Sequence, residues 1–297
     1  MESLSLETLR FRRSAFTTLD VRGQARFRAG HLAESGHLPE SELRARRSEL
    51  PPRDTPVLVV GDDPMRARNA AGRLESLGYH LVAWLDARLE DVEGGVADRG
   101  QAARLWRPSP FLEQVLPRLP EPRSGARRAL DLAAGAGREA VFLAMQGYAV
   151  DAWDHDRGAL EGAQALASRH GVAIATEVRN LERRDPELST GRYDLITVFR
   201  FLHRPLFPHI ERALAPGGAL VYETYRRGQE RFGRPKHPRF LLDPGELARA
   251  FPSLAVELYE ELEPDGGPIL ARLLARRPTG NDRDLPADEE SDLLFGA

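Results

Sequence analysis

A glycine-rich turn between two apolar segments constrains this chain more than any other feature. Residues 131–156 read DLAAGAGREAVFLAMQGYAVDAWDHD. The spacing predicts a buried strand over 128–132, a helix over 138–146 ended by Gly147, and a second strand over 149–153 that ends at Asp154. An acid at the end of the second strand, 17 residues beyond Gly137, is typical of folds in which a carboxylate binds ribose hydroxyls. The sequence therefore predicts a nucleotide site at a strand–turn–helix–strand unit.

Charge around the turn separates the two kinds of cofactor that such a turn can bind. A dinucleotide site places a pyrophosphate at the helix N-terminus and uses a third glycine, where this chain has Ala140. Asp131 and Glu139 bracket the turn, and their carboxylates would repel a pyrophosphate. S-adenosylmethionine has no phosphate and bears a sulfonium and an ammonium group, which acids attract. We therefore expect S-adenosylmethionine as the cofactor.

Composition excludes several other classes of protein. The chain has 297 residues, enough for two domains, and no cysteine, which excludes disulfides, thiolate metal sites and cysteine nucleophiles; we expect no metal. A net charge of −3 gives no global basic field for nucleic acid or an anionic membrane. The apolar runs are shorter than a membrane span, and residues 1–3 do not begin a signal peptide. We expect a soluble, cytoplasmic protein.

The distribution of apolar, proline, glycine and charged residues divides the chain into four regions. Short apolar runs alternate with helical segments over 1–95 and again, on a larger scale, over 128–277. Between them, residues 96–127 are rich in proline, glycine and arginine and read as a linker with one short helix around Phe111–Leu119. Residues 278–297 are acidic and without periodicity, which predicts a mobile tail. The fold class is α/β throughout.

The region 128–277 resembles class I S-adenosylmethionine-dependent methyltransferases. The strings DLAAGAGREAVFLA, GYAVDAWD and FLLDPGEL are most similar to the tellurite-resistance and thiopurine-type enzymes, and LAPGGAL is common to the superfamily. The resemblance covers residues 105–277 and implies a Rossmann-like, seven-stranded sheet with one reversed edge strand. Tellurite-type members have a His-Arg pair where this chain has Glu263-Pro264, which argues against tellurite as the acceptor.

The resemblance also implies which residues bind the cofactor. Asn180 would contact the adenine, and the backbone at Phe199 would complete the pocket, with Trp106 and Phe111 closing over it. The whole set expected to bind the cofactor is Asp131, Ala133, Gly135, Gly137, Asp154, His155, Asn180, Leu181, Phe199 and Trp106.

Four residues near the expected methyl group are the candidates for catalysis. His203 and Arg204 follow the fourth predicted strand, and Glu223 and Tyr225 end the fifth on the same side of the sheet. An amine or hydroxyl acceptor needs a base, which would be His203 or Glu223, whereas a thiolate or a soft metalloid anion needs only positioning and desolvation. The run RRGQERFGRPKHPRF, with six basic residues, is expected to form a lid that attracts an anionic substrate.

The first region resembles a rhodanese domain across most of residues 8–95. In that family an acid–arginine pair (here Asp20 and Arg22) and a Gly-His pair (Gly30 and His31) build the scaffold, and a catalytic cysteine follows the strand expected here at Val57–Val60. That position is Gly61, so no persulfide can form and we expect no sulfurtransferase activity.

We therefore expect an enzyme that transfers methyl groups to a small, soft or anionic acceptor. The inactive rhodanese-like region would act as a docking or dimerisation module in a homodimer. Two alternatives stay open: a non-catalytic cofactor-binding or regulatory protein, and an RNA or protein methyltransferase. Nucleic acid is disfavoured because phosphate-binding surfaces need dense lysine and arginine.

Overall fold

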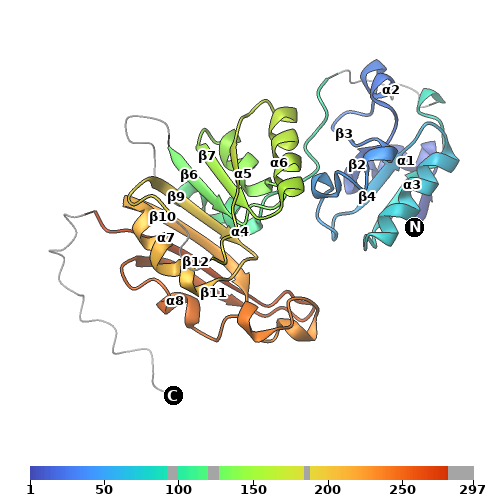
Figure 1. Cartoon of the computed structure of the whole chain (residues 1–297). Coiled ribbons are helices and arrows are strands. Elements are labelled where there is room, and N and C mark those ends of the chain that lie inside the picture. Colours follow the sequence, from blue (N-terminus) through green and yellow to red (C-terminus); the bar gives the residue numbers. More distant parts are fainter. Residues whose placement is uncertain (92–99, 120–126, 184–187, 280–297) are drawn as a thin grey trace. The chain divides into compact units, whose positions relative to one another are not determined.

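Two compact units make up the computed structural model, which describes residues 1–91, 100–119, 127–183 and 188–279. The first unit comprises Met1–Arg107 and is drawn from blue to cyan in Figure 1; the second begins at Pro108. Each unit has its own sheet, so each is described separately.

The first unit is built on a parallel five-stranded sheet of order β1-β5-β4-β2-β3. Its central strand reads VLVV and is buried on both faces, as is usual in parallel sheets. Among the described residues of this unit, three helices and four short 3₁₀ turns accompany the sheet. The strands are β1 (Glu2–Leu4), β2 (Thr17–Asp20), β3 (Gly36–His37), β4 (Val57–Val60) and β5 (Val82–Leu85). The helices are α1 (Leu6–Arg12), α2 (Gln24–Ala29) and α3 (Pro64–Ser76), and the turns are η1 (Arg13–Ala15), η2 (Glu40–Glu42), η3 (Arg47–Glu49) and η4 (Leu89–Asp91).

The second unit contains a seven-stranded sheet of order β11-β12-β10-β9-β6-β7-β8. The strands are β6 (Arg128–Leu132), β7 (Ala149–Asp154), β8 (Ala175–Val178), β9 (Tyr193–Phe199), β10 (Leu214–Tyr225), β11 (Ala255–Leu262) and β12 (Leu270–Arg276). The helices are α4 (Pro110–Val115), α5 (Arg138–Met145), α6 (Arg157–Arg169), α7 (Phe207–Ala213) and α8 (Glu246–Arg249). The 3₁₀ turns are η5 (Leu116–Arg118), η6 (Arg204–Leu206), η7 (Gln229–Arg231) and η8 (Pro238–Phe240). These two sheets confirm the predicted pair of α/β domains.

The reversed strand is not at the edge of the sheet, and that detail of the expectation is wrong. β12 runs antiparallel to both neighbours and lies between β10 and β11. The cause is the hairpin at the end of the unit: β11 leads into a turn around Gly266-Gly267, and the returning strand β12 pairs with β10, which leaves β11 outermost. One face is packed against α7 and α8 through a core that includes Ile210, Leu247 and Phe251.

Parallel pairing brings the ends of five strands to one edge. β6 pairs with β7 and β9, β7 with β8, and β9 with β10, all in parallel. In register, Asp131 faces Thr197 and Phe199 faces Glu223. Ligands in open α/β sheets bind at the carboxyl ends of the strands, so this edge is where a site is expected.

The segment read as a linker is divided between the two units. Leu105 belongs to the core of the first unit, and a Cβ on Gly36 would lie 2.1 Å from its Cγ, so a side chain at Gly36 would displace Leu105. α4 and η5 in the second unit cover Pro110–Arg118, nearly all of the stretch Phe111–Leu119 for which the sequence favours a short helix. The predicted tail, 278–297, lies almost wholly outside the described residues. Within the described part of the chain, no helix combines the length and apolarity that crossing a bilayer requires.

Candidate active site

The glycine turn after β6 adopts left-handed backbone conformations at alternate residues. Ala133, Gly135 and Gly137 have φ values of 58°, 52° and 77°. A Cβ on Gly137 would lie 2.5 Å from the Cβ of Ala163 in α6, so glycine is needed there both for its φ and for the approach of α6. A Cβ on Gly135, in contrast, would meet nothing within 4 Å. The turn is therefore closely packed against α6 at Gly137, whereas there is open space beside Gly135.

Asp154, at the end of β7, lies against this turn. Its Oδ2 accepts a hydrogen bond from the Gly135 backbone amide at 2.8 Å, and its Oδ1 accepts one from the Asp156 amide at 2.9 Å. The Asp154 side chain is only 8 % exposed, whereas the neighbouring His155 is 81 % exposed, with Nδ1 3.1 Å from Asp154 Oδ1. The carboxylate is thus held in place by backbone donors, and each oxygen keeps a lone pair for a ligand hydroxyl.

Asp131, at the end of β6, is a buried carboxyl group with an unused oxygen. Thr197 Oγ1 donates to its Oδ1 at 2.9 Å, while its Oδ2 is buried without a hydrogen-bond partner. Burial, with a further contribution from the charge of Glu139, raises the pKa of Asp131 well above its ordinary value. A bound cation would both pair with the free oxygen and return the pKa toward normal. This is the side chain at the turn best suited to an ammonium group.

The other residues expected to bind the cofactor are distributed over several elements. Leu181 is buried, and Asn180 is exposed after β8, with its Oδ1 accepting from the Glu182 amide at 3.0 Å. Phe199 ends β9, two strands from Asp154. Trp106 is the next-to-last residue of the first unit, with the Arg104 guanidinium 5.0 Å from its ring centroid, so the second unit does not include it.

Glu223 forms a buried ionic cluster at the end of β10. Its side chain is fully buried, and Arg272 Nε donates to Oε2 at 2.6 Å. Arg200 Nη2 lies 3.1 Å from Oε1, and Ser109 Oγ donates to the same oxygen at 3.2 Å. Both oxygens are therefore occupied, two of the partners being arginines.

Sequence reasoning missed two members of this cluster. Ser109 followed by Pro110 is a typical start of a helix, because serine caps the helix N-terminus and proline suits the first turn. That signal could have located Ser109. Arg272 could not have been found, since it lies 49 residues from Glu223 and the two meet only through the pairing of β10 with β12.

The other three candidates for catalysis have different surroundings. His203 is partly buried, and its Nε2 has no hydrogen-bond partner among the described residues. Arg204 makes four hydrogen bonds, two to Glu246 and one each to the carbonyls of Arg239 and Leu241. The bonds to Glu246 raise the pKa of Arg204. Arg204 thus anchors segment 239–246, whereas Tyr225 is partly exposed at the end of β10.

A pocket of about 650 Å³ opens at the carboxyl ends of β9 and β10. Tyr225 lines it, whereas Arg204, Glu223 and His203 do not. We name it the β9–β10 pocket; its lining residues are Arg200, Phe201, Leu202, Thr224, Tyr225, Arg234, Pro235, Lys236, His237 and Phe240. In the sheet, β9 lies between β10 and β6, the strand that leads into the glycine turn.

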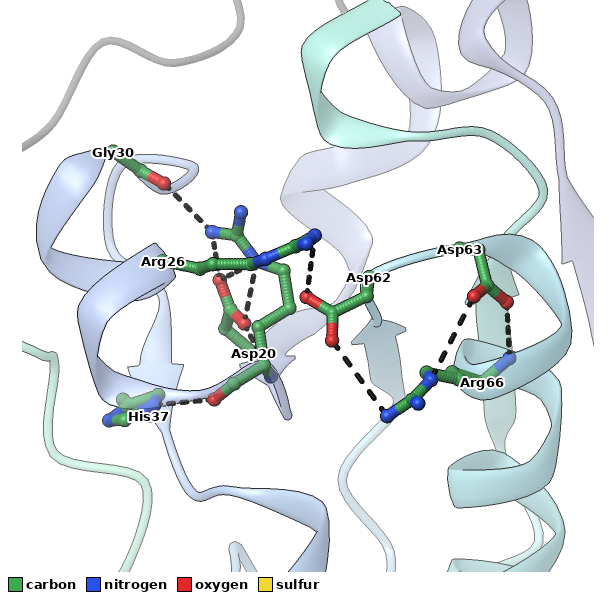
Figure 2. A network of polar contacts seen from close by, with 8 residues as sticks. Asp20, Arg26, Gly30, His37, Asp62, Asp63 and Arg66 are labelled. Carbon is green, nitrogen blue, oxygen red and sulfur yellow. Dashed lines mark hydrogen bonds and ion pairs between the residues drawn. The ribbon is translucent and has the colours of Figure 1, made fainter.

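In the first unit, the loop after β4 is closed around Gly61, where a sulfurtransferase has its catalytic cysteine. A Cβ on Gly61 would lie 2.6 Å from the backbone nitrogen of Ala67 and 3.0 Å from its Cα, so the loop is closed around a residue without a side chain. Asp62 lies between two arginines, 3.1 Å from Arg26 Nη1 and 4.0 Å from Arg66 Nη1 (Figure 2). Asp63 caps α3 by accepting from the Arg66 amide at 2.9 Å. Carboxylates thus occupy the loop.

The scaffold pairs expected in this unit are present. Arg22 Nη2 donates to Asp20 Oδ2 at 2.7 Å and to the Gly30 carbonyl at 2.8 Å. His31 is fully buried, with Nδ1 3.0 Å from the Phe27 carbonyl and its ring stacked on that of Phe27. His37 Nε2 lies 2.9 Å from the carbonyl of Arg22. These contacts give His31 a structural role.

Comparison with known proteins assigns both units. Residues 6–93 match the family model described as a rhodanese-like domain, and residues 124–218 match that of the tellurite resistance protein TehB. An uncharacterized protein of Schizosaccharomyces pombe is 22% identical over 289 residues, 80% of this chain and 85% of that protein.

Two further relatives are methyltransferases by name. The ribosomal RNA small subunit methyltransferase B of Thermus thermophilus is 30% identical over 179 residues, 50% of this chain and 44% of that protein. The probable S-adenosyl-L-methionine-dependent methyltransferase TehB of Haemophilus influenzae is 29% identical over 86 residues, 28% of this chain and 29% of that protein. The match therefore spans less than half of each of these two proteins. The chain joins a rhodanese-like domain, which lacks cysteine, to a TehB-like domain of the S-adenosylmethionine-dependent methyltransferases.

Proposed function

We propose that the second unit transfers a methyl group from S-adenosylmethionine to a small, soft or anionic acceptor. The observation on which this rests most is the buried, unpartnered Oδ2 of Asp131 beside an open glycine turn. Asp131 would bind the ammonium group of the cofactor, and Asp154 its ribose hydroxyls. The bound cofactor supplies an electrophilic methyl group on a sulfonium.

The residues around the acceptor differ in their suitability as a base. Glu223 has both oxygens engaged by Arg200, Arg272 and Ser109, so a proton would have to displace an arginine. His203 has an unpartnered Nε2 and can accept a proton if its ring is in the matching tautomer. We therefore propose His203 as the proton acceptor for a hydroxyl or amine nucleophile, and Glu223 as a positioning residue.

For the rhodanese-like unit we propose a docking or dimerisation role without sulfur transfer. The support is the loop around Gly61, which is closed and acidic. Sedimentation of the full chain and of a chain lacking residues 1–107 tests this role. An unchanged monomeric state of the full chain, together with unaltered methyl transfer by the shortened one, would contradict it.

An RNA acceptor is the second candidate, because one relative is by name a ribosomal RNA methyltransferase. Against it, the net charge is −3, and phosphate contacts need many unpaired cations. A transfer assay with tritiated cofactor, run in parallel on small carboxylates, thiols and bulk RNA at physiological salt, separates the two. Calorimetry with S-adenosylhomocysteine tests cofactor binding on its own, and failure to bind would overturn the proposed function.

A further inference from the structure

The basic segment 226–240 is electrically neutralised everywhere except at the β9–β10 pocket. Four of its six cations pair with carboxylates: Arg226 with Glu261 and Glu263, Arg227 with Asp243, Arg231 with Glu263, and Arg239 with Glu182. The other two, Arg234 and Lys236, form no ion pair within the described residues, and both line the pocket. The unbalanced positive charge of the segment is thus concentrated in one cavity.

A third cation, Arg200, enters the same pocket from the end of β9. Its backbone has a φ of 57°, and its amide donates to the Glu223 carbonyl at 2.8 Å, which fixes the point where the chain leaves the strand. Its guanidinium is oriented by Glu223 Oε1 at 3.1 Å and by the ring of Tyr225, whose centroid is 4.9 Å away. Glu223 also pairs with Arg272, which in turn lies 4.0 Å from Glu260, so Arg200 shares its carboxylate with a second arginine while its own side chain lines the pocket.

Apart from its cations, the lining of the pocket is largely apolar. Phe201, Tyr225 and Phe240 contribute aromatic rings, and no aspartate or glutamate is among the lining residues. Rings of this kind bind planar ligands by offset stacking or edge contacts. A cavity that combines three cations, three rings and no acid matches one chemical class: an aromatic ring bearing a negative charge.

We propose that the β9–β10 pocket binds an aromatic carboxylate as the methyl acceptor, with its carboxylate on Arg200 and its ring against Tyr225. This rests on the proposed methyltransferase function. The Arg200 side chain leans toward β10, away from β6 and the glycine turn, so the carboxylate binds at the far end of the acceptor. The opposite side of the ring then faces the methyl donor.

The group that accepts the methyl is therefore a ring substituent and not the carboxylate. For a ring hydroxyl, the oxygen forms a bond to the methyl carbon while the carbon–sulfur bond breaks. The electron pair of that bond stays on sulfur, which becomes a neutral thioether. The hydroxyl proton passes through water to the imidazole of His203, which follows the lining residue Leu202 but does not itself line the pocket.

The test uses 3-hydroxy-2-naphthoate, whose own fluorescence reports binding, and 2-naphthol as the matched probe without a carboxylate. Both are titrated into the full chain with saturating S-adenosylhomocysteine. Arg200→Asn removes the guanidinium while supplying a residue that tolerates positive φ. Arg234→Gln with Lys236→Gln is a second variant at exposed, unpaired positions. Arg227→Gln, which removes one positive charge as Arg200→Asn does and lies in segment 226–240 but outside the pocket, is the control.

We expect the naphthoate to bind and the naphthol to bind at least about tenfold more weakly, since hydrogen bonds to a charged group each contribute roughly tenfold or more. Arg200→Asn should weaken naphthoate binding by a similar factor, the double variant by several fold, and Arg227→Gln by less than twofold. Equal binding of the two probes, or binding unaffected by both pocket variants, would overturn the proposal.

Cofactor binding is measured separately in each variant, so that the two hypotheses fail in different ways. If S-adenosylhomocysteine binds and the naphthoate does not, the pocket assignment is wrong while methyl transfer stands. If the naphthoate binds with the expected dependence on Arg200 but no S-adenosylhomocysteine binds, the pocket assignment stands and the proposed function falls.

Discussion

Asp154 Oδ2 accepts a hydrogen bond from the backbone amide of Gly135 at 2.8 Å, across the turn between β6 and α5. The acid expected to bind ribose therefore also holds the glycine turn in its left-handed conformation, before any ligand binds. Binding and the shape of the turn are coupled through one side chain. Removing this carboxylate should therefore reduce the free energy of ligand binding by more than its direct contacts to the ligand contribute.

Asp154→Ala should weaken binding of S-adenosylhomocysteine by about 1–3 kcal/mol, since ligand hydroxyls would lose their acceptor and the Gly135 amide would lose its partner. Asp154→Asn retains an acceptor oxygen and should lose less. Calorimetry on both variants measures this order. Unchanged affinity in Asp154→Ala would exclude the residue from the site, and tight binding of NADH by the parent chain would exclude S-adenosylmethionine as its cofactor.

Asp131→Asn should make the free protein more stable at neutral pH while weakening cofactor binding. Burial, assisted by Glu139, raises the pKa of Asp131 in the folded state, so its contribution to stability is fully present below the unfolded pKa of about 3.9. That contribution is lost as the pH rises through the folded pKa. Each unit of the shift corresponds to about 1.4 kcal/mol at higher pH.

Thermal unfolding of parent and Asp131→Asn between pH 4 and pH 8 checks the sign. The variant should have the higher Tm at the upper end of this range, and the difference should shrink toward pH 4. Cofactor affinity should fall about tenfold, since an amide cannot pair with an ammonium as a charge does. A variant that melts below the parent at pH 8 would show that the parent carboxylate is stabilised when ionised.

Glu223→Gln separates a positioning role from a role as base. Removing the charge leaves Arg272 and Arg200 without their shared carboxylate. Breaking an ion pair whose partners are both buried lowers the free energy of unfolding by about 3–5 kcal/mol. Because Arg200 is 38 % exposed, we expect a smaller loss of about 2–3 kcal/mol. As a positioning residue, Glu223 should affect Tm and the KM for the acceptor more than kcat. As a base, it would abolish kcat with an unchanged Tm. Glu260→Gln, at a carboxylate 4.0 Å from the same Arg272, is the control and should change little.

The sequence predicts the parts of the site that depend on local geometry. The turn needs glycine where φ is positive, and the acid at the end of β7 follows it at a fixed spacing, so Gly137 and Asp154 could be located before the fold was known. The same holds for Asp20 and Arg22, which are two residues apart and directly bonded.

Contacts between distant strands could not be predicted in this way. Arg204 follows β9 and was expected to face the acceptor, but its partner Glu246 lies 42 residues further on, and no local pattern shows that the pair is formed. The position of β12 between β10 and β11 has the same origin: a hairpin can dock by either of its strands, and its sequence does not state which one.

Gly61→Cys should not restore sulfur transfer and should destabilise the first unit. The new Cβ would lie 2.6 Å from the Ala67 nitrogen and 3.0 Å from its Cα, both backbone atoms at the start of α3, so the loop would have to move before a thiol could be accommodated. Overpacking of this kind typically costs about 1–3 kcal/mol. Asp62, held between Arg26 and Arg66, would in addition repel the thiolate and the thiosulfate donor (Figure 2).

Gly72→Cys is the matched control, because Gly72 lies within α3 and a Cβ there would meet nothing within 4 Å. It introduces the same thiol into the same unit, and replacing a helical glycine should leave stability unchanged or raise it by up to about 1 kcal/mol. Thermal unfolding and a thiosulfate-to-cyanide transfer assay compare the two variants. Sulfurtransferase activity in Gly61→Cys without a fall in Tm would show that the loop is open enough for a nucleophile, and that cysteine is all it lacks.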